Sequence, residues 1–241
     1  MPHFLVQKEE IQPEYIKLID ESTLFHLVKV LRVKTGETVK FIDEYFNIYN
    51  SVVTEIKKDY LLAKIVSKSV SKRILKYNIS LVQSVLMADS QNLLIANAAQ
   101  TGVKKIYPVI TDNTSSKVSH DKIAKWQKIV SENFKQCERA DMAYVVPINE
   151  LRETLKKFKK ENILIFAEKD CNISLNKSLE DIDKTSEIAV VIGPEGGFSD
   201  REFEYFKKEQ YKLISLGNMI YKAPNAVVAA ISNVVSRLED V

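Results

Sequence analysis

From residue 73 to residue 241, short apolar runs alternate with helical patterns, and this alternation limits the possible folds more than any other feature of the sequence. Strands are predicted at residues 79–85, 105–110, 162–167, 188–192 and 213–216, with a short one near Val145, and helices at 90–101, 121–137, 150–158, 200–209 and 225–238. Apolar strands that alternate with helices are typical of a mostly parallel sheet covered on both faces. We therefore predict an α/β domain that spans residues 73–241.

The first 72 residues follow a different pattern. Segments rich in β-branched and aromatic residues, separated by polar turns, predict strands at residues 3–6, 38–43, 48–56 and 60–66. Apolar residues at helical spacing predict one helix at 24–32, with Ser22 or Thr23 as its N-cap. This indicates a small β-barrel domain at residues 1–72. The basic segment 67–76 has little periodicity and is predicted to be the linker.

Composition excludes several classes of protein. The 35 basic and 32 acidic residues leave a net charge of +3, too little for binding nucleic acid by bulk charge alone. Two cysteines, Cys137 and Cys171, and three scattered histidines do not have the spacing of a metal site, so no metal is expected. No apolar run is long enough to span a membrane, and Met1 is not followed by an apolar leader. We expect a cytoplasmic protein.

Glycine and proline cluster near the C-terminus. Half of the six glycines and six prolines lie within residues 193–224. The loop Gly193-Pro-Glu-Gly-Gly197 follows the apolar run 188–192 and precedes Ser199-Asp-Arg-Glu202, a capping box that starts a helix. A glycine loop between strand and helix places bare backbone where open α/β sheets bind ligands. A tight turn without a ligand explains this loop equally well, and a second cluster at 215–226 favours the ligand.

Charge narrows the choice of ligand. The glycine loop carries Glu195 and no lysine, unlike loops that bind phosphate groups. A carboxylate suits a cationic ligand such as the sulfonium of S-adenosylmethionine. Besides the two clusters at 193–197 and 215–226, the end of a third strand, at residues 166–170, is expected to supply the remaining wall of the site. An apolar slot for adenosine could be lined by Ile192, Leu216, Ile220 and Ala226.

These residues carry a family resemblance. The run Ile192-Gly-Pro-Glu-Gly-Gly-Phe-Ser199, followed by Ser215-Leu-Gly217 and Ala226, resembles the signature of the SPOUT-class RNA methyltransferases. It is most similar to the bacterial RsmE family, which methylates N3 of a uridine in small-subunit (16S) ribosomal RNA. The opening residues 1–6, the segment 26–33 and Gly36 resemble that family's PUA-like barrel. Gly102-Val103, residues 126–128, Gln136 and Arg139 resemble its catalytic domain.

The resemblance implies a homodimeric S-adenosylmethionine-dependent methyltransferase that acts on ribosomal RNA or the small ribosomal subunit. A PUA-like RNA-binding barrel would occupy residues 1–72, and a SPOUT domain with a trefoil knot would occupy 73–241. The expected cofactor-binding residues are Phe166, Ala167, Glu168, Ile192, Gly193, Pro194, Glu195, Gly196, Gly197, Leu216, Gly217, Asn218, Ile220 and Ala226.

Other residues are expected to handle the RNA. Lys222 would stabilise negative charge on the target base, or is an ordinary surface lysine. Arg139 and Gln136 would orient the nucleotide, although Arg139 also suits a salt bridge to Glu138 or Asp141. RNA contacts are expected from His26, Arg32, Lys34, Lys72 and Arg73.

The sequence departs from the family at the second cluster. Where the family usually has an arginine, a leucine-arginine pair, a glutamate and a threonine, this chain has Met219, Tyr221-Lys222, Pro224 and Asn225. Lysine keeps the positive charge of arginine and loses its bidentate fork. An alternative is therefore a catalytically degenerate SPOUT-fold protein that only binds RNA. A nucleotide-dependent enzyme is a second alternative, but it needs a phosphate loop that the sequence lacks.

The last predicted helix bears on the dimer. Val227, Ile231, Val234 and Leu238 form a wide apolar face. This face either contributes to a dimer interface or simply covers the sheet.

Overall fold

The structure is a computed structural model that describes residues 3–114, 121–137, 139 and 141–239. The chain forms two compact units. Unit 1 comprises Met1–Ile74 and Phe134–Asp141, and unit 2 comprises Leu75–Asn133 and Met142–Val241. The domain limits of 1–72 and 73–241 stay a prediction, because these units divide after Ile74 and unit 1 also takes in residues 134–141.

Unit 1 contains a mixed five-stranded sheet with the strand order β1-β3-β4-β5-β2. The strands are β1 (His3–Leu5), β2 (Tyr15–Leu18), β3 (Thr38–Ile42), β4 (Asn47–Ile56) and β5 (Leu61–Val70), with a short 3-10 helix η1 (Lys8–Glu10) between the first two. Only β1 and β3 pair in parallel. Strand β2 was not predicted, and β5 continues to Val70, so the prediction of a linker was wrong for residues 67–70.

The helix of unit 1 begins earlier than predicted. Helix α1 (Glu21–Phe25) has Asp20 as its N-cap, and the Asp20 carboxylate accepts a hydrogen bond from the Thr23 amide at 2.8 Å. Ser22 and Thr23 lie inside the helix, so neither is the cap. Aspartate caps at least as well as serine or threonine, because its carboxylate also favours the positive end of the helix dipole. The helix continues directly into a π-helical segment, η2 (His26–Val30).

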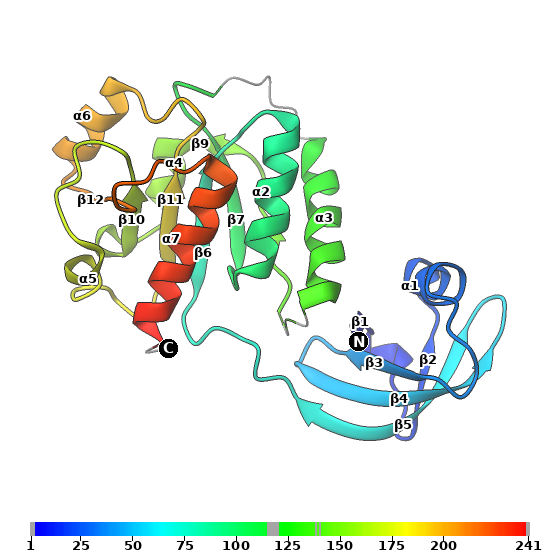
Figure 1. Ribbon diagram of the computed structural model, residues 1–241. Coiled ribbons are helices and arrows are strands. Elements are labelled where there is room, and N and C mark those ends of the chain that lie inside the picture. The colour runs from blue at the N-terminus through cyan, green and yellow to red at the C-terminus, as the bar shows by residue number, and fades with distance from the viewer. Residues whose placement is uncertain (1–2, 115–120, 138, 140, 240–241) are drawn as a thin grey trace. The chain divides into compact units, whose positions relative to one another are not determined.

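Unit 2 contains the predicted parallel sheet (Figure 1). Its order is β12-β10-β11-β6-β7-β8, with β9 also beside β7, and every pair is parallel. The strands are β6 (Ile79–Ser84), β7 (Lys105–Ile110), β8 (Tyr144–Val145), β9 (Asn149–Glu150), β10 (Ile163–Phe166), β11 (Ile188–Ile192) and β12 (Lys212–Ile214). The helices are α2 (Ala88–Gln100), α3 (Lys122–Cys137), α4 (Leu151–Leu155), η3 (Lys160–Asn162), α5 (Leu175–Ser178), α6 (Asp200–Lys208) and α7 (Ala223–Leu238). The last turn of α3, from Phe134, belongs to unit 1. The α/β fold class is confirmed.

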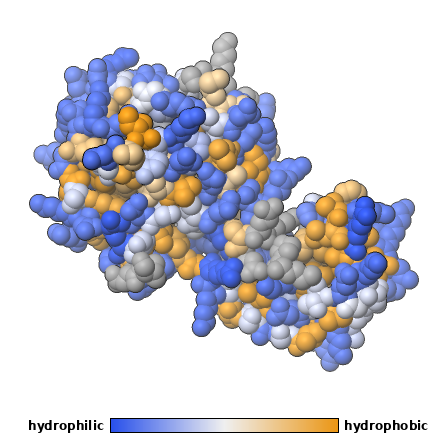
Figure 2. Space-filling model, viewed as in Figure 1, coloured by the Kyte–Doolittle hydropathy of each residue, from blue (hydrophilic) through white to orange (hydrophobic). Residues whose placement is uncertain are grey.

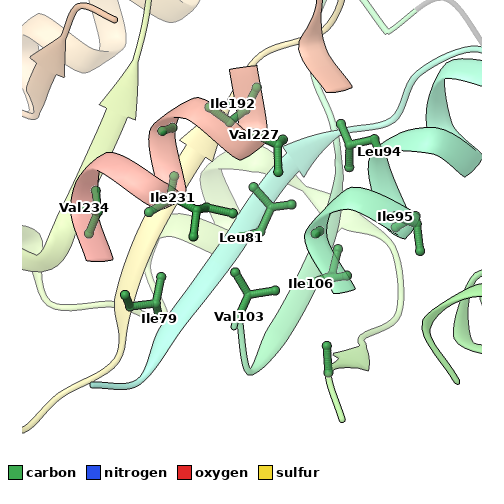
Figure 3. Packing of buried hydrophobic residues seen from close by; sticks show 14 of the residues in the cluster. Ile79, Leu81, Leu94, Ile95, Val103, Ile106, Ile192, Val227, Ile231 and Val234 are labelled. Atoms are coloured by element: carbon green, nitrogen blue, oxygen red, sulfur yellow. The ribbon is translucent and has the colours of Figure 1, made fainter. Parts of the chain in front are cut away.

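Helices cover both faces of this sheet. Figure 3 shows side chains of α2 and α7 pointing onto strand residues such as Leu81 and Ile106. On the other face, α4 and α6 pack against alternate strand residues such as Ile165 and Val191. The apolar face of α7 that includes Val227 belongs to the first of these cores. That face therefore covers the sheet and gives no separate support for a dimer.

Two features bear on the class of protein. Among the described residues, no helix has both the length and the apolar character needed to cross a bilayer. In the same part of the chain, no group of three or more histidine, cysteine, aspartate or glutamate residues is arranged to hold a metal ion.

Candidate functional site

Three neighbouring strands of unit 2 end at the same level. Phe166, the last residue of β10, is the Cα partner of Ile192 in β11 and of Ile214 in β12. Because these strands are parallel, the loops that follow them leave the sheet from one edge. These loops are residues 167–174, 193–199 and 215–222. Open α/β sheets bind ligands at this edge, so the three loops form the candidate functional site, which we call the carboxyl edge.

All fourteen expected cofactor-binding residues lie in these strand ends, in these loops or in the first turns of α7. Phe166 and Ile192 are buried, whereas Leu216 and Ala226 are half-buried against the core. Ile220 is 82% exposed. An adenosine slot built from these residues would therefore have buried, half-buried and exposed walls. Their role in cofactor binding stays a prediction.

The glycines of the loop 193–199 serve different purposes. The Gly197 amide donates to the Pro194 carbonyl at 2.9 Å, and Gly197 has a φ of +69°, which closes a tight turn. At Gly193, a Cβ atom would lie 3.2 Å from the ring of Phe198. Phe198 is buried and packs edge-to-face on Phe206. Gly193 therefore makes room for a ring of its own chain.

Gly217 in the third loop is different. Its φ is +99°, and a Cβ atom at this position would meet no atom within 4 Å. The Gly217 amide donates to Ser215 Oγ at 3.0 Å, which fixes the backbone locally. The conformation requires glycine, and the space beside it is open.

The loop after β7 supports the glycine loop. Asn113 donates from Nδ2 to the carbonyl oxygens of Gly197 and Gly196, at 3.1 and 3.4 Å. Thr111 and Thr114 hold the start of this loop, because the Thr111 amide donates to Thr114 Oγ1 at 2.9 Å. This support was not predicted from the sequence. The signal was present as Thr111-Asp-Asn-Thr114, a polar run of turn-forming residues directly after a strand.

The predicted capping box is confirmed and extended. Ser199 Oγ accepts from the Glu202 amide at 3.1 Å, and Glu202 Oε2 accepts from the Ser199 amide at 2.8 Å. Glu202 is buried, and its Oε1 also accepts from the Asp112 amide at 3.2 Å. Asp112 Oδ2 in turn accepts from Ser199 Oγ at 2.6 Å. The start of α6, which follows the glycine loop, is therefore bonded to the loop after β7.

Replacing Asn113 with alanine is expected to weaken binding of S-adenosylhomocysteine about fivefold, because the glycine loop loses a hydrogen bond worth about 1 kcal/mol. Isothermal titration calorimetry measures this directly. Asn233→Ala is the matched control, since Asn233 Nδ2 also donates to a backbone carbonyl, that of Ala229 at 2.8 Å within α7. Parental affinity in Asn113→Ala would show that the loop keeps its shape without this support.

The loop after β10 is bonded to β12. The Ala167 amide donates to the Ile214 carbonyl at 3.0 Å. The Asn172 amide donates to the Leu213 carbonyl at 3.0 Å. The Leu213 amide donates in turn to Asn172 Oδ1, also at 3.0 Å. These bonds hold the loop 167–174 against β12, the strand from which the loop 215–222 leaves.

Ion pairs connect the same loop to α6. Lys169 Nζ lies 2.7 Å from Asp200 Oδ1, and Asp170 Oδ2 lies 3.1 Å from Lys207 Nζ. The hydrogen bond from Lys169 lowers the pKa of the Asp200 carboxyl. Burial raises the pKa of the nearby Cys171 thiol, and the charge of Asp170 adds to this. Cys171 is therefore poorly suited to act as a thiolate nucleophile.

Lys222 lies at the start of α7. It is the N-cap residue, and its backbone carbonyl accepts from the amides of Asn225 and Ala226, both at 2.9 Å. Its side chain makes no capping bond and is exposed. The first turn is also bonded to α2, because Asn97 Nδ2 donates to the Pro224 carbonyl at 3.1 Å. The backbone here is held in place, and the ammonium group projects from it.

The other expected functional residues lie in unit 1. Arg139 is buried, and its guanidinium donates to Asp141 at 3.1 Å, which is one of the two partners considered for a salt bridge. Gln136 lies in α3, and Glu138 lies outside the described residues. The five expected RNA contacts all belong to unit 1, where four are exposed and His26 is half-buried. The roles of these residues stay predictions.

Family comparisons agree with this architecture. A model of the RNA methyltransferase domain matches residues 73–235, and a model of the RNA methyltransferase PUA domain matches residues 19–66. The first match contains every residue of the carboxyl edge.

Individual relatives match over nearly the whole chain. The Ribosomal RNA small subunit methyltransferase E of Rickettsia conorii is 27% identical over 225 residues, covering 91% of this chain and 88% of the relative. The protein of the same name from Mesomycoplasma hyopneumoniae is 26% identical and covers 95% and 96%. A crystal structure of Ribosomal RNA small subunit methyltransferase E from Neisseria gonorrhoeae, bound to S-adenosyl methionine, superposes with a TM-score of 0.82 at 27% identity, covering 97% and 96%.

Proposed function

The chain belongs to the RNA methyltransferase family, and from this membership we propose that it transfers a methyl group from S-adenosylmethionine to N3 of a uridine in 16S ribosomal RNA. The expected family resemblance and cofactor class are confirmed by the comparisons. The observation that carries the proposal is the carboxyl edge itself, where Phe166, Ile192 and Ile214 end in register and present the glycine loop beside the loop that contains Gly217.

The residues of the carboxyl edge fit this cofactor. A Cβ atom at Gly197 or at Gly217 would meet no other atom within 4 Å, so both loops leave room beside the main chain. Glu168 and Glu195 are exposed at the same edge and carry the negative charge that a cationic ligand tolerates. When bound, S-adenosylmethionine supplies an electrophilic methyl group on a sulfonium centre. Residues of the three loops would hold it.

The chain must also act on the target base. N3 of uracil carries a proton at neutral pH, and negative charge develops on the ring as that proton leaves. We propose that the Lys222 ammonium, which is exposed at the start of α7, stabilises this charge. We further propose that Arg139 and Gln136 orient the nucleotide, with Asp141 holding the Arg139 guanidinium.

We propose that unit 1 holds the RNA through His26, Arg32, Lys34, Lys72 and Arg73. We also propose a homodimer that works in the cytoplasm, with a trefoil knot in unit 2. Support for the dimer comes from α2 and α7, which are packed against each other and expose Leu93 and Val228. Exposed apolar side chains on neighbouring helices are typical of a surface that a partner covers.

The test compares ribosomal RNA nucleosides from cells with and without this protein by mass spectrometry. We expect 3-methyluridine to be absent from 16S ribosomal RNA without the protein and restored by its expression. If 3-methyluridine stays at the parental level, the proposed reaction is wrong. Binding of S-adenosylhomocysteine and RNA without any transfer of a labelled methyl group would instead support the degenerate RNA-binding protein.

A further inference from the structure

Unit 1 exposes a row of apolar side chains on its short helix. Phe25, Val30 and Leu31 are 62%, 56% and 44% exposed, although large apolar residues on so short a segment usually pack inward. Figure 2 shows apolar residues gathered over α1 and η2. We call Phe25, Val30, Leu31 and Arg32 the ridge. Exposed apolar surface of this kind usually marks a binding surface.

The π-helical turn builds this row. The Leu31 amide donates to the His26 carbonyl at 2.9 Å, a bond between residues five apart rather than four. The wider turn brings Phe25 and Val30 closer to one side of the segment than an α-helical turn would, because five residues complete little more than one π-helical turn. Such turns are rare and are frequently found at functional sites.

Arg32 ends the turn in a strained conformation. Its φ is +56°, and the next amide, that of Val33, donates back to the Leu27 carbonyl at 3.0 Å. Glycine or asparagine usually occupies this left-handed position after a helix, because a side chain there costs about 1 kcal/mol. Arg32 is exposed, so its side chain does not repay this cost by packing in the core. The same conformation follows α6 at Gln210, whose φ is +54°, so the strain at Arg32 marks the end of a helical segment. Exposure is what leaves the Arg32 side chain available to a partner.

The charges of the ridge favour RNA over protein. Lys29, Arg32 and Lys34 are exposed within six residues, at the end of the segment where the row of apolar side chains lies. Two acidic residues, Asp20 and Glu21, lie at the start of α1, where the Asp20 carboxylate caps the helix and Glu21 is exposed one turn before Phe25. Glu37 accepts a hydrogen bond from the Lys34 amide at 3.1 Å, so the cations nearest the exposed apolar residues are Lys29 and Arg32. Aromatic surface beside cations is the combination that binds unpaired nucleotides, since bases stack on the ring and phosphates pair with the cations.

We propose that the ridge binds an unpaired segment of ribosomal RNA, with Phe25 stacking on a base and Arg32 contacting a phosphate. This inference rests on the proposed function, since it names how that RNA is held. It adds Phe25 and the two aliphatic residues to the contacts.

The key experiment replaces Arg32 with glycine. Glycine relieves the strain, so the Tm should be equal to that of the parent or up to about 2 °C higher. The Kd for a fluorescein-labelled 20-nucleotide single-stranded RNA of mixed sequence should rise about tenfold. The slope of log Kd against log salt concentration should fall by about one, the value for one lost phosphate contact. A residue that only stabilised the fold would instead lower the Tm when replaced.

Gln210→Gly is the matched control. Gln210 is exposed, has a φ of +54° and follows α6, where the Tyr211 amide donates to the Phe206 carbonyl at 2.9 Å. Its replacement relieves the same kind of strain in unit 2, and the RNA affinity should stay at the parental value.

Phe25 tests the stacking. Phe25→Ala should raise the Kd for the single-stranded RNA about tenfold, and Phe25→Leu should recover little of this loss, because leucine lacks a flat ring. Neither variant should change binding to a fully paired duplex of equal length. The inference is wrong if Arg32→Gly and Phe25→Ala bind the single strand as the parent does. It is also wrong if these changes alter only the oligomeric state in light scattering, since a second copy would then cover the ridge.

Calorimetry with S-adenosylhomocysteine separates this inference from the proposed function. The ridge variants should keep the parental affinity for this cofactor product, because the carboxyl edge lies in unit 2. A parent that binds single-stranded RNA through the ridge and gives no heat with S-adenosylhomocysteine would contradict the methyltransferase proposal alone.

Discussion

Replacing Gly217 with alanine is expected to weaken the binding of S-adenosylhomocysteine by at least about 30-fold, because two effects combine. A φ of +99° lies outside the range that alanine adopts at low cost, and the strain is of order 1–3 kcal/mol. The added Cβ also enters the open space beside Gly217, where the cofactor is proposed to lie. Titration calorimetry measures the change in affinity, and thermal unfolding measures the strain.

Gly36→Ala separates the two effects. Gly36 lies in unit 1, has a φ of +91° and likewise has no atom within 4 Å of a Cβ position. Its replacement should cost a similar amount of stability and leave the affinity for S-adenosylhomocysteine within about twofold of the parent. Equal affinities for the two variants would mean that Gly217 does not face the cofactor.

Replacing Lys222 with alanine is expected to lower the methylation rate about 100-fold at saturating RNA. Groups that stabilise charge developing in a transition state typically contribute a factor of this size. The affinity for S-adenosylhomocysteine should stay unchanged, because the Lys222 backbone, which caps α7, is kept. The measurement is the transfer of a labelled methyl group to assembled small subunits under single-turnover conditions.

Two further variants separate the effect of the charge at Lys222 from the effect of removing any exposed lysine. Lys222→Arg keeps the positive charge and should retain more activity than Lys222→Ala. Lys208→Ala removes another exposed lysine, in the last turn of α6, and should leave the rate unchanged. Turnover by Lys222→Ala at the parental rate would remove Lys222 from the reaction and leave stabilisation of the base to another group.

Strong local signals made the sheet of unit 2 predictable. An apolar run such as 188–192 is stable as a strand only when both faces of its sheet are covered. It therefore predicts a buried strand in a sheet with helices on both sides. The capping box at Ser199 fixed the start of α6 in the same way. The order of the strands followed from neither signal, because residues that pair across a sheet are distant in the sequence.

The hydrogen bonds from Asn113 to the glycine loop could not be predicted for the same reason. Asn113 lies more than eighty residues before Gly197 in the sequence, and only the pairing of β6 with both β7 and β11 brings their loops to one edge. The end of β5 was missed because its residues 67–70 are exposed and lack the apolar alternation that predicts a strand. The cap at Asp20 was missed because Ser22 and Thr23 are also common caps and lie closer to the apolar pattern.

The packing of Phe198 against Gly193 has an evolutionary consequence. A Cβ atom at 193 would lie 3.2 Å from that ring, so a larger residue there requires the ring to shift, whether or not a methyl donor is bound. Gly217 is kept as glycine by its φ of +99°, which does not depend on a donor either. Retention of both glycines in a diverging lineage therefore reports an intact backbone and interior, and does not by itself report a working enzyme.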